Sequence, residues 1–332
     1  MTPGNNLRGK LSVLPKALLP LLLTSLFSVP AVADPAMEWV QKMSDAMRNL
    51  NYRGNFVYMH ENQLESMQIS HTRDAMGEKE RLVSLNGEAR EVIRDNQNLT
   101  CIWPSSRKVV VDLSRKNSFS PIFIPEDIAR LEKFYDMQLI GRDRIAGMET
   151  VIVHIDPKDQ YRYGMKFWIN TRNGLMMKSS LIDEHDREIE QVMFTSLELL
   201  DDDEILDLDV MPPIDENYTL VRYHRGDNAA TAAATSAWQL DEAPGGFWRE
   251  SVLQRRIPNS DHVVEQMVYT DGLASLSVFI ELQTNEAHQG SSSMGAVNAF
   301  IRILNDHSVT AIGEVPAVTV RKVAESISYR RQ

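Results

Sequence analysis

The chain has 332 residues, of which 43% are hydrophobic, and a formal net charge of −11. An acidic chain lacks the basic surface with which proteins contact nucleic-acid phosphates, so we expect no nucleic-acid partner. Cys101 is the only cysteine, which excludes an internal disulfide and is expected to be a buried structural thiol. A chain of this length can bury one large core or, as we expect, two smaller ones.

The first 33 residues have the pattern of a secretory signal peptide. Three basic residues precede an apolar run over residues 17–29, and Ala31-Val32-Ala33 forms a small-x-small cleavage signal. The run is too short for a comfortable membrane span. We therefore expect an exported, soluble mature chain that begins at Asp34, and loss of the three basic residues lowers its formal charge from −11 to −14.

A helix is predicted at the start of the mature chain. Asp34 can accept a hydrogen bond as the N-cap, and Pro35 suits the first helical position. Val40, Met43 and Met47 recur at helical spacing and give one apolar stripe. This helix should lie against the sheet that follows.

Short strands joined by tight turns follow, with no helix between them. Leu99, Cys101 and Trp103 alternate with polar residues, as expected for a strand with one buried face. Asn86-Gly87 predicts a two-residue hairpin, because both central residues of a type I′ turn need positive φ. The expected strands cover residues 54–60, 64–71, 79–85, 88–94, 98–103 and 107–113, which together form an antiparallel meander.

Residues 115–125 are predicted to be a loop, and a second helix is expected from Pro125 with its apolar side reaching Leu139. Residues 161–169 show the clearest alternation in the chain, and the other strands expected here are residues 149–155, 175–183 and 188–199. About ten strands with two helices predict an α+β fold. Its N-terminal domain, residues 34–214, should be a large open antiparallel β-barrel with helices set against it.

The composition changes after Leu199. The acidic run over residues 201–209 has no glycine at the turn position of a calcium loop, so it is interpreted as a solvated edge. Residues 215–237 are predicted to form a linker. Residues 238–332 should form a smaller domain, an antiparallel sheet with a helix after Pro316. Its expected strands are residues 247–257, 261–270, 273–283, 295–304 and 308–314, and Asp271-Gly272 joins the second to the third.

Catalytic motifs are absent from the sequence. It has no Gly-x-Ser-x-Gly elbow, no His-Glu-x-x-His, no phosphate-binding glycine loop and no cysteine pair. The eight histidines have no ligand spacing. We therefore expect no enzyme activity, no catalytic residue, no cofactor and no metal site.

Aromatic and methionine side chains on the expected strands allow two interpretations. They form an ordinary core, or they line a concave face that holds an acyl chain or an apolar peptide. The candidates for such a lipid groove are Phe56, Tyr58, Trp103, Met165, Phe167 and Met176.

Several segments resemble the RseB/MucB family of periplasmic sigma-factor regulators. The N-terminal segments are residues 52–58 (YRGNFVY), 80–94 (ERLVSLNGEAREVIR) and 161–169 (YRYGMKFWI). The C-terminal segments are residues 269–274 (YTDGLA), 277–281 (SVFIE) and 313–316 (GEVP). The resemblance covers essentially the whole mature chain, in order.

This resemblance implies an N-terminal domain like the lipoprotein carriers LolA and LolB, and a smaller C-terminal domain on a flexible linker. It implies a negative regulator in the periplasm that binds the periplasmic part of a membrane-bound, RseA/MucA-like anti-sigma factor. Binding would shield that factor from the site-1 protease of the envelope stress response. Lipid or lipopolysaccharide would release it, and in pseudomonad-like relatives the system restrains alginate production.

Aromatic residues of the C-terminal domain are the candidate anchors for that partner by residue type, namely Trp238, Trp248, Tyr269 and Phe279. Lipopolysaccharide phosphates would need a local basic patch, for which the candidates are Arg90, Arg94, Arg107 and Lys108. Two other classes stay open. A plain lipid or lipoprotein carrier has no need of residues 238–332, and a periplasmic hydrolase would need an activity that depends on a specific His or Asp. A homo-oligomer also stays open.

Overall fold

The computed structural model describes residues 34–61, 63–96, 98–112, 127–201, 217–223, 236–256, 263–283 and 289–330. The signal peptide expected over residues 1–33 and the loop expected over residues 115–125 lie outside these residues. So does all of the acidic run except Asp201.

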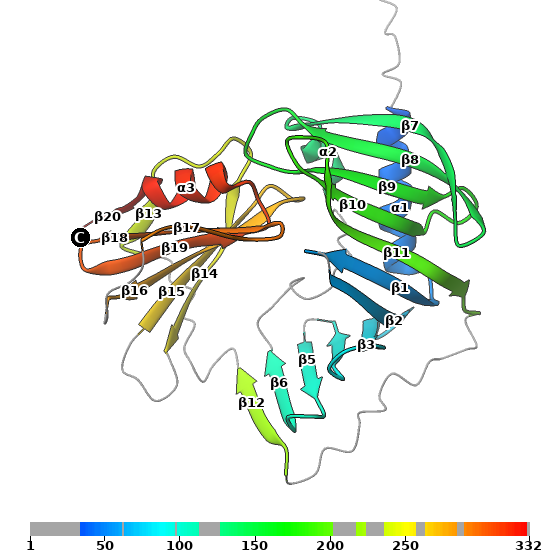
Figure 1. Cartoon of the computed structure of the whole chain (residues 1–332), viewed down its shortest axis with the longest axis horizontal. Helices are drawn as coiled ribbons and strands as arrows, with labels where there is room; N and C mark the ends of the chain where they lie inside the picture. The colour runs from blue at the N-terminus through cyan, green and yellow to red at the C-terminus, as the bar shows by residue number, and fades with distance from the viewer. Residues whose placement is uncertain are drawn as a thin grey trace, which may run out of the picture. The chain divides into compact units, whose positions relative to one another are not determined.

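One large sheet contains twelve strands (Figure 1). Their order is β12-β6-β5-β4-β3-β2-β1-β11-β10-β9-β8-β7, and every neighbouring pair is antiparallel except β12 and β6. The strands are β1 (Tyr52–His60), β2 (Gln63–Asp74), β3 (Gly77–Ser84), β4 (Glu91–Asp95), β5 (Asn98–Trp103), β6 (Lys108–Asp112), β7 (Tyr135–Ile145), β8 (Met148–Pro157), β9 (Gly164–Asn170), β10 (Met176–Ile182), β11 (Glu188–Leu199) and β12 (Thr219–Tyr223). No pairing among the described strands joins β12 to β7, so the sheet is open, which confirms the expected fold class.

Helix α1 (Pro35–Asn49) packs its apolar stripe into the core formed with this sheet. The predicted cap is confirmed, because the Asp34 side chain accepts a hydrogen bond from Ala36 N at 2.9 Å. Val40, Met43 and Met47 are buried against inward-facing residues of the strands. Cys101 is buried in the same core, as expected.

A second, smaller sheet has six strands in the order β14-β15-β16-β19-β18-β17. Helix α3 (Ala317–Ser326) contacts β17, β18 and β19, and β13 pairs with β20. The strands are β13 (Trp238–Leu240), β14 (Trp248–Arg256), β15 (Val263–Thr270), β16 (Ser275–Leu282), β17 (Gly290–Met294), β18 (Val297–Leu304), β19 (His307–Gly313) and β20 (Ile327–Tyr329). This sheet has its own core, which includes Met267, Val278, Val309 and Val323.

The prediction of a helix from Pro125 to Leu139 is wrong for most of its length. Only α2 (Ile128–Leu131) is helical within its described part, and Tyr135 begins the edge strand β7. Tyr135 and Met137 are buried while Asp136 and Gln138 are exposed, so burial alternates with the period of a strand.

Two turn and boundary predictions also need correction. The Asn86-Gly87 turn joins paired strands, but only Gly87 has positive φ, at 70°, so this is not a type I′ turn. Residues 85–90 form a longer connection. The predicted linker, residues 215–237, contains β12, which pairs in parallel with β6.

A charged cluster lies beside the C-terminal end of α1. Glu78 Oε1 accepts hydrogen bonds from His71 Nε2 at 3.2 Å and from Arg94 Nη2 at 2.6 Å, and Arg94 also contacts Glu80. His71 Nδ1 faces the carbonyl of Leu50 at 2.9 Å. Burial alone would raise the pKa of Glu78, but the hydrogen bonds and charges of His71 and Arg94 outweigh it and lower the pKa to about 2.

We predict that Glu78→Gln removes an acid-dependent part of the stability. The carboxyl ionises more readily in the folded chain, with a pKa of about 2 against 4.5, so its contribution is complete above pH 4.5 and disappears as the pH falls towards 2. The expected loss of unfolding free energy at neutral pH is on the order of 3 kcal/mol, and it vanishes near pH 2. Denaturant unfolding from pH 2.5 to 7 measures it. Glu149→Gln, at an exposed glutamate of β8, is the control, and a pH-independent loss in Glu78→Gln would contradict the prediction.

Candidate functional site

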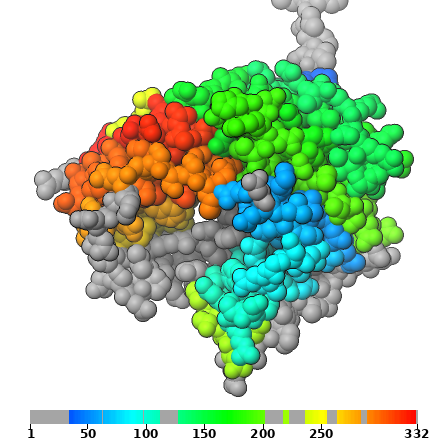
Figure 2. Space-filling view, in the orientation of Figure 1, coloured from blue at the N-terminus to red at the C-terminus, as the bar shows by residue number. Residues whose placement is uncertain are grey.

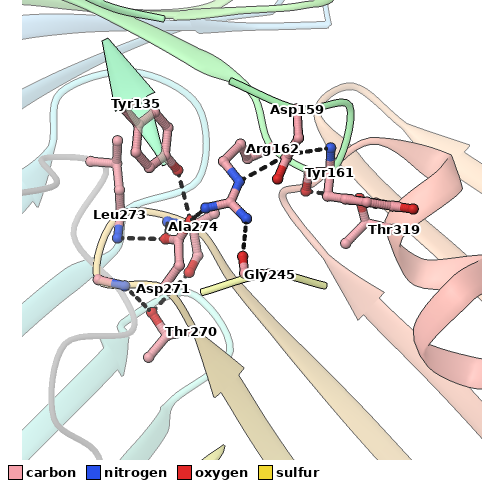
Figure 3. Close-up of polar contacts among 11 residues, drawn as sticks. Tyr135, Asp159, Tyr161, Arg162, Gly245, Thr270, Asp271, Leu273, Ala274 and Thr319 are labelled. Atoms are coloured by element: carbon pink, nitrogen blue, oxygen red, sulfur yellow. Dashed lines mark hydrogen bonds and ion pairs between the residues drawn. The ribbon is translucent and has the colours of Figure 1, made fainter. Parts of the chain in front are cut away.

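The turn between β15 and β16 carries a carboxylate that reaches strands of the large sheet (Figure 3). Asp271 Oδ1 accepts hydrogen bonds from the backbone N–H groups of Leu273 and Ala274, at 2.9 and 2.7 Å. Gly272, with φ of 98°, lets the chain turn sharply there. The turn thereby orients Oδ2, which accepts from Arg162 Nη1 at 2.7 Å and from the Tyr135 hydroxyl at 2.9 Å.

Arg162 and Asp271 form a fully buried ion pair, since both side chains have 0% exposure. All three nitrogens of the Arg162 guanidinium donate hydrogen bonds. Nε donates to Asp159 at 3.1 Å, Nη1 donates to Asp271, and Nη2 donates to the carbonyl of Gly245. The rings of Phe134 and Phe247 lie about 5 Å from the guanidinium, at 5.0 and 5.1 Å. Full pairing of both ions is what makes their burial tolerable.

The residues on either side of Arg162 bind the smaller sheet as well. The Tyr161 carbonyl accepts a hydrogen bond from the Thr319 hydroxyl of α3 at 2.8 Å. The Tyr163 hydroxyl accepts from Asn298 Nδ2 of β18 at 3.0 Å. We call Tyr135, residues 161–163 and their partners on the smaller sheet and on helix α3 the junction. The strand predicted over residues 161–169 therefore begins only at Gly164, because residues 161–163 serve these contacts rather than a strand pairing.

A small cavity of about 80 Å³ lies at the junction. Its lining is mostly apolar and aromatic and comprises Tyr135, Tyr163, Met165, Leu181, Leu273, Ala274, Ser275 and Glu314. Burial and the charge of Asp271 raise the pKa of Tyr135, so this hydroxyl stays protonated and can donate. The cavity can accept a small apolar group, such as a side chain or the end of an acyl chain.

Acidic groups gather beside this cavity. The Tyr58 hydroxyl donates to Glu190 Oε2 at 2.8 Å, and burial together with that carboxylate raises the pKa of Tyr58. Glu314 is exposed as a whole residue, yet protein atoms pack around its carboxyl group. This burial raises the pKa of Glu314, and the charge of Glu190 raises it further. Two carboxylates in one neighbourhood disfavour a further anionic group there.

The candidate lipid-groove residues occupy different depths. Phe56, Phe167 and Met176 are fully buried in the core with α1, at 0% exposure. Tyr58, Trp103 and Met165 are half-buried and pack against that core, and Met165 also lines the junction cavity.

The candidate partner anchors divide in the same way. Trp238 and Tyr269 are buried in the core of the smaller sheet. Trp248 and Phe279 are half-buried, and Arg130 stacks 3.9 Å from the Trp248 ring. The ten candidates do not form one cluster: Met165 lines the junction cavity and Trp248 lies beside Arg130 of α2, while Trp103 and Phe279 lie on β5 and β16.

Two of the four basic candidates are neutralised by glutamates. Arg90 contacts Glu65 at 3.1 Å, and Arg94 contacts Glu78 and Glu80. Arg107 and Lys108 are exposed, and no ion pair is formed by either with the described carboxylates.

Sequence reasoning missed the residues that make the junction, chiefly Tyr135, Arg162 and Asp271. The residue types were visible in the sequence, but each had a sufficient interpretation in its local pattern. Asp271-Gly272 was a turn motif, and Arg162 was a polar position in a strand pattern. Only the pairing of positions that are 109 residues apart makes them a site.

Within the described ranges, no group of three or more His, Cys, Asp or Glu side chains is placed to hold a metal ion. No helix in this part of the chain has the length and apolar character to cross a membrane. The fold is built on two sheets that contact each other at the junction.

Family models match both sheets. The MucB/RseB N-terminal domain matches residues 35–214, and the MucB/RseB C-terminal domain matches residues 232–328. The chain belongs to the MucB/RseB family, whose curated members are sigma-factor regulatory proteins.

Two relatives illustrate the similarity. The sigma factor AlgU regulatory protein MucB of Pseudomonas aeruginosa is 32% identical over 317 residues, which are 92% of this chain and 95% of MucB. The sigma-E factor regulatory protein RseB of Escherichia coli K12 is 26% identical over 310 residues, 92% of this chain and 94% of RseB.

Solved structures agree. The complex of Pseudomonas aeruginosa MucA and MucB contains a chain with a TM-score of 0.69 and 27% identity, covering 90% of this chain and 100% of that one. A crystal structure of MucB has a TM-score of 0.62 and 26% identity, covering 89% of this chain and 98% of that one.

We predict that Asp271→Asn destabilises the chain by about 3 kcal/mol, because it removes the buried counter-ion of Arg162 and leaves only the partly exposed carboxylate of Asp159 as its ionic partner. Denaturant unfolding of the chain from Asp34 measures the loss. The double variant Arg162→Met with Asp271→Asn keeps a side-chain acceptor for the backbone of Leu273 and Ala274, and it should be more stable than either single variant because it removes both charges of the buried pair. Arg53→Gln, which breaks an exposed ion pair with Glu198, is the control. Equal losses in the single and double variants would contradict the assigned role of the ion pair.

Proposed function

We propose that this chain is a periplasmic regulator that binds the periplasmic part of a membrane-bound anti-sigma factor and shields it from the site-1 protease. The observation that carries the proposal is the similarity to MucB, solved in complex with MucA, over the full length of that MucB chain. Matches to both family domains support a role that uses both sheets. A signal peptide over residues 1–33 would export the chain.

The functional units proposed are residues 34–214 as the open-barrel domain, residues 215–237 as the connection and residues 238–332 as the C-terminal domain. The protein acts by binding and has no catalytic residue.

Release of the partner by lipid or lipopolysaccharide would be a case of thermodynamic linkage between two binding equilibria. A ligand releases the partner only if it binds the partner-free state more tightly. The half-buried residues Tyr58, Trp103 and Met165 can be reached with little rearrangement, and the junction cavity of about 80 Å³ accepts only the end of an acyl chain. A full chain that reaches Phe56, Phe167 and Met176 must take the place of α1 against the sheet.

Trp248 and Phe279 are the proposed anchors for the partner, because both are half-buried and can offer ring surface without unfolding the sheet. Alanine at either position should weaken the affinity for the anti-sigma segment at least tenfold while the chain stays folded. Alanine at Trp238 or Tyr269, which are 6% and 4% exposed, should instead destabilise the smaller sheet. Calorimetric titration and thermal unfolding separate the two effects. Unchanged affinity in both Trp248→Ala and Phe279→Ala would refute the anchor assignment.

The proposal is tested by titrating the chain from Asp34 with the periplasmic segment of the cognate anti-sigma factor, with and without lipid A. We expect tight binding that lipid A weakens. Lipid binding without affinity for the segment would overturn the proposal and support a lipid carrier. Binding of the segment that lipid A leaves unchanged would retain the regulator and refute the lipid signal.

A further inference from the structure

Strand β12 is the edge strand next to β6, and it comes from a part of the chain that neither family model matches. The two matched regions end at residue 214 and begin again at residue 232, and β12 covers residues 219–223 between them. It is the only parallel strand in either described sheet. Figure 2 shows its yellow-green atoms at the surface beside the cyan atoms of β6.

Backbone pairing, rather than side-chain burial, holds β12. Thr219 pairs with Lys108 and Val221 with Val110 in a continuous register, and Thr219 N donates to the Arg107 carbonyl at 2.7 Å. The described side chains of β12 contribute little burial: Thr219 and Leu220 are exposed, Leu220 at 45%, and Val221 is half-buried. The net free energy of exposed backbone hydrogen bonds is small, and ordering the strand costs conformational entropy. The pairing of β12 with β6 is therefore only weakly stable.

Strand β6, by contrast, is anchored in the molecule. Val109 is 0% exposed, and Val110 packs against the large core. Three consecutive valines, residues 109–111, give this strand a high β-propensity. Without β12, β6 would therefore remain in place and present an unpaired edge.

The other edge of the same sheet is protected differently. Strand β7 has a register shift between Leu139 and Gly141, followed by the charged residues Arg142, Asp143 and Arg144. Bulges and charges of this kind discourage the addition of a strand. The β6–β12 register has no such irregularity over its five pairs. The two edges are thus built differently, and only the β6 edge accepts a strand.

We infer that the β6 edge is a docking site for an extended segment of a partner polypeptide, and that β12 occupies this site in place of the partner. β12 itself shows that the edge accepts a parallel strand with apolar residues at its centre. The partner segment carries an acidic residue at its N-terminal end, because that end lies beside the exposed Arg107 and Lys108. This inference does not depend on the anti-sigma proposal.

A labelled peptide that copies residues 215–224 (DENYTLVRYH) is the probe, and its binding to the chain from Asp34 is measured by fluorescence anisotropy. Thr219→Pro removes the hydrogen bond to Arg107 and weakens β12, so this variant should bind the peptide at least tenfold more tightly than the unmodified chain. Leu220→Ser changes only an exposed side chain and should leave the affinity unchanged.

A reversible lock provides the second measurement. Val110→Cys with Val221→Cys, at two register partners, should abolish peptide binding when the thiols are joined by a disulfide and restore it when they are reduced. The same molecule is then its own control. A peptide with Asp215→Asn and Glu216→Gln should bind at least threefold more weakly. Equal binding to the oxidised and reduced lock, or no binding to Thr219→Pro, would overturn the inference.

Discussion

The buried ion pair between Arg162 and Asp271 is the constraint on which the relation between the two sheets depends. Each charge has lost its water, and each is tolerable only because the other is 2.7 Å away and the remaining donors and acceptors are occupied. Such a pair adds little net stability compared with apolar residues, but it strongly disfavours any arrangement in which one charge stays buried alone. It therefore selects one docking of the β15–β16 turn on the large sheet.

This constraint gives the proposed regulation a physical basis. Tyr161, Arg162 and Tyr163 bind helix α3, the β15–β16 turn and strand β18, respectively. If the junction opens, water must replace all three of these contacts together. A ligand that favours the opened state must supply that free energy through its differential affinity. In the proposed regulation, the mostly apolar lining of the junction cavity and the carboxylates of Glu190 and Glu314 would favour the apolar part of a ligand over an anionic head group at this position.

Patterns with one dominant local cause were predicted correctly from the sequence. The cap at Asp34 and the stripe of α1 are fixed by neighbouring residues, and β5 and β11 have the bounds that their alternation predicts. The helix prediction for residues 128–139 was wrong because their apolar positions suit both a helix and a strand. Pairing with β8 makes the chain a strand from Tyr135 onwards. The strand β12 was missed because it is only five residues long and its described side chains, those of Thr219, Leu220 and Val221, are not buried, so they give no one-sided apolar pattern.

The candidate site was less predictable for a related reason. A buried arginine cannot be distinguished from an exposed one by its neighbours in sequence, since its burial depends on a carboxylate 109 residues away. Selecting sites by aromatic residue type also favoured core positions, as Phe56, Phe167 and Trp238 show. The family resemblance supplied the function, whereas the junction could only be found from the three-dimensional structure.

The central claim is that both sheets together hold an anti-sigma partner. Hydrogen–deuterium exchange of the chain from Asp34, with and without the periplasmic anti-sigma segment, tests it most directly. The account predicts slower exchange on binding both in strands of the large sheet near the junction and in the strands that carry Trp248 and Phe279. Protection confined to one sheet would contradict it.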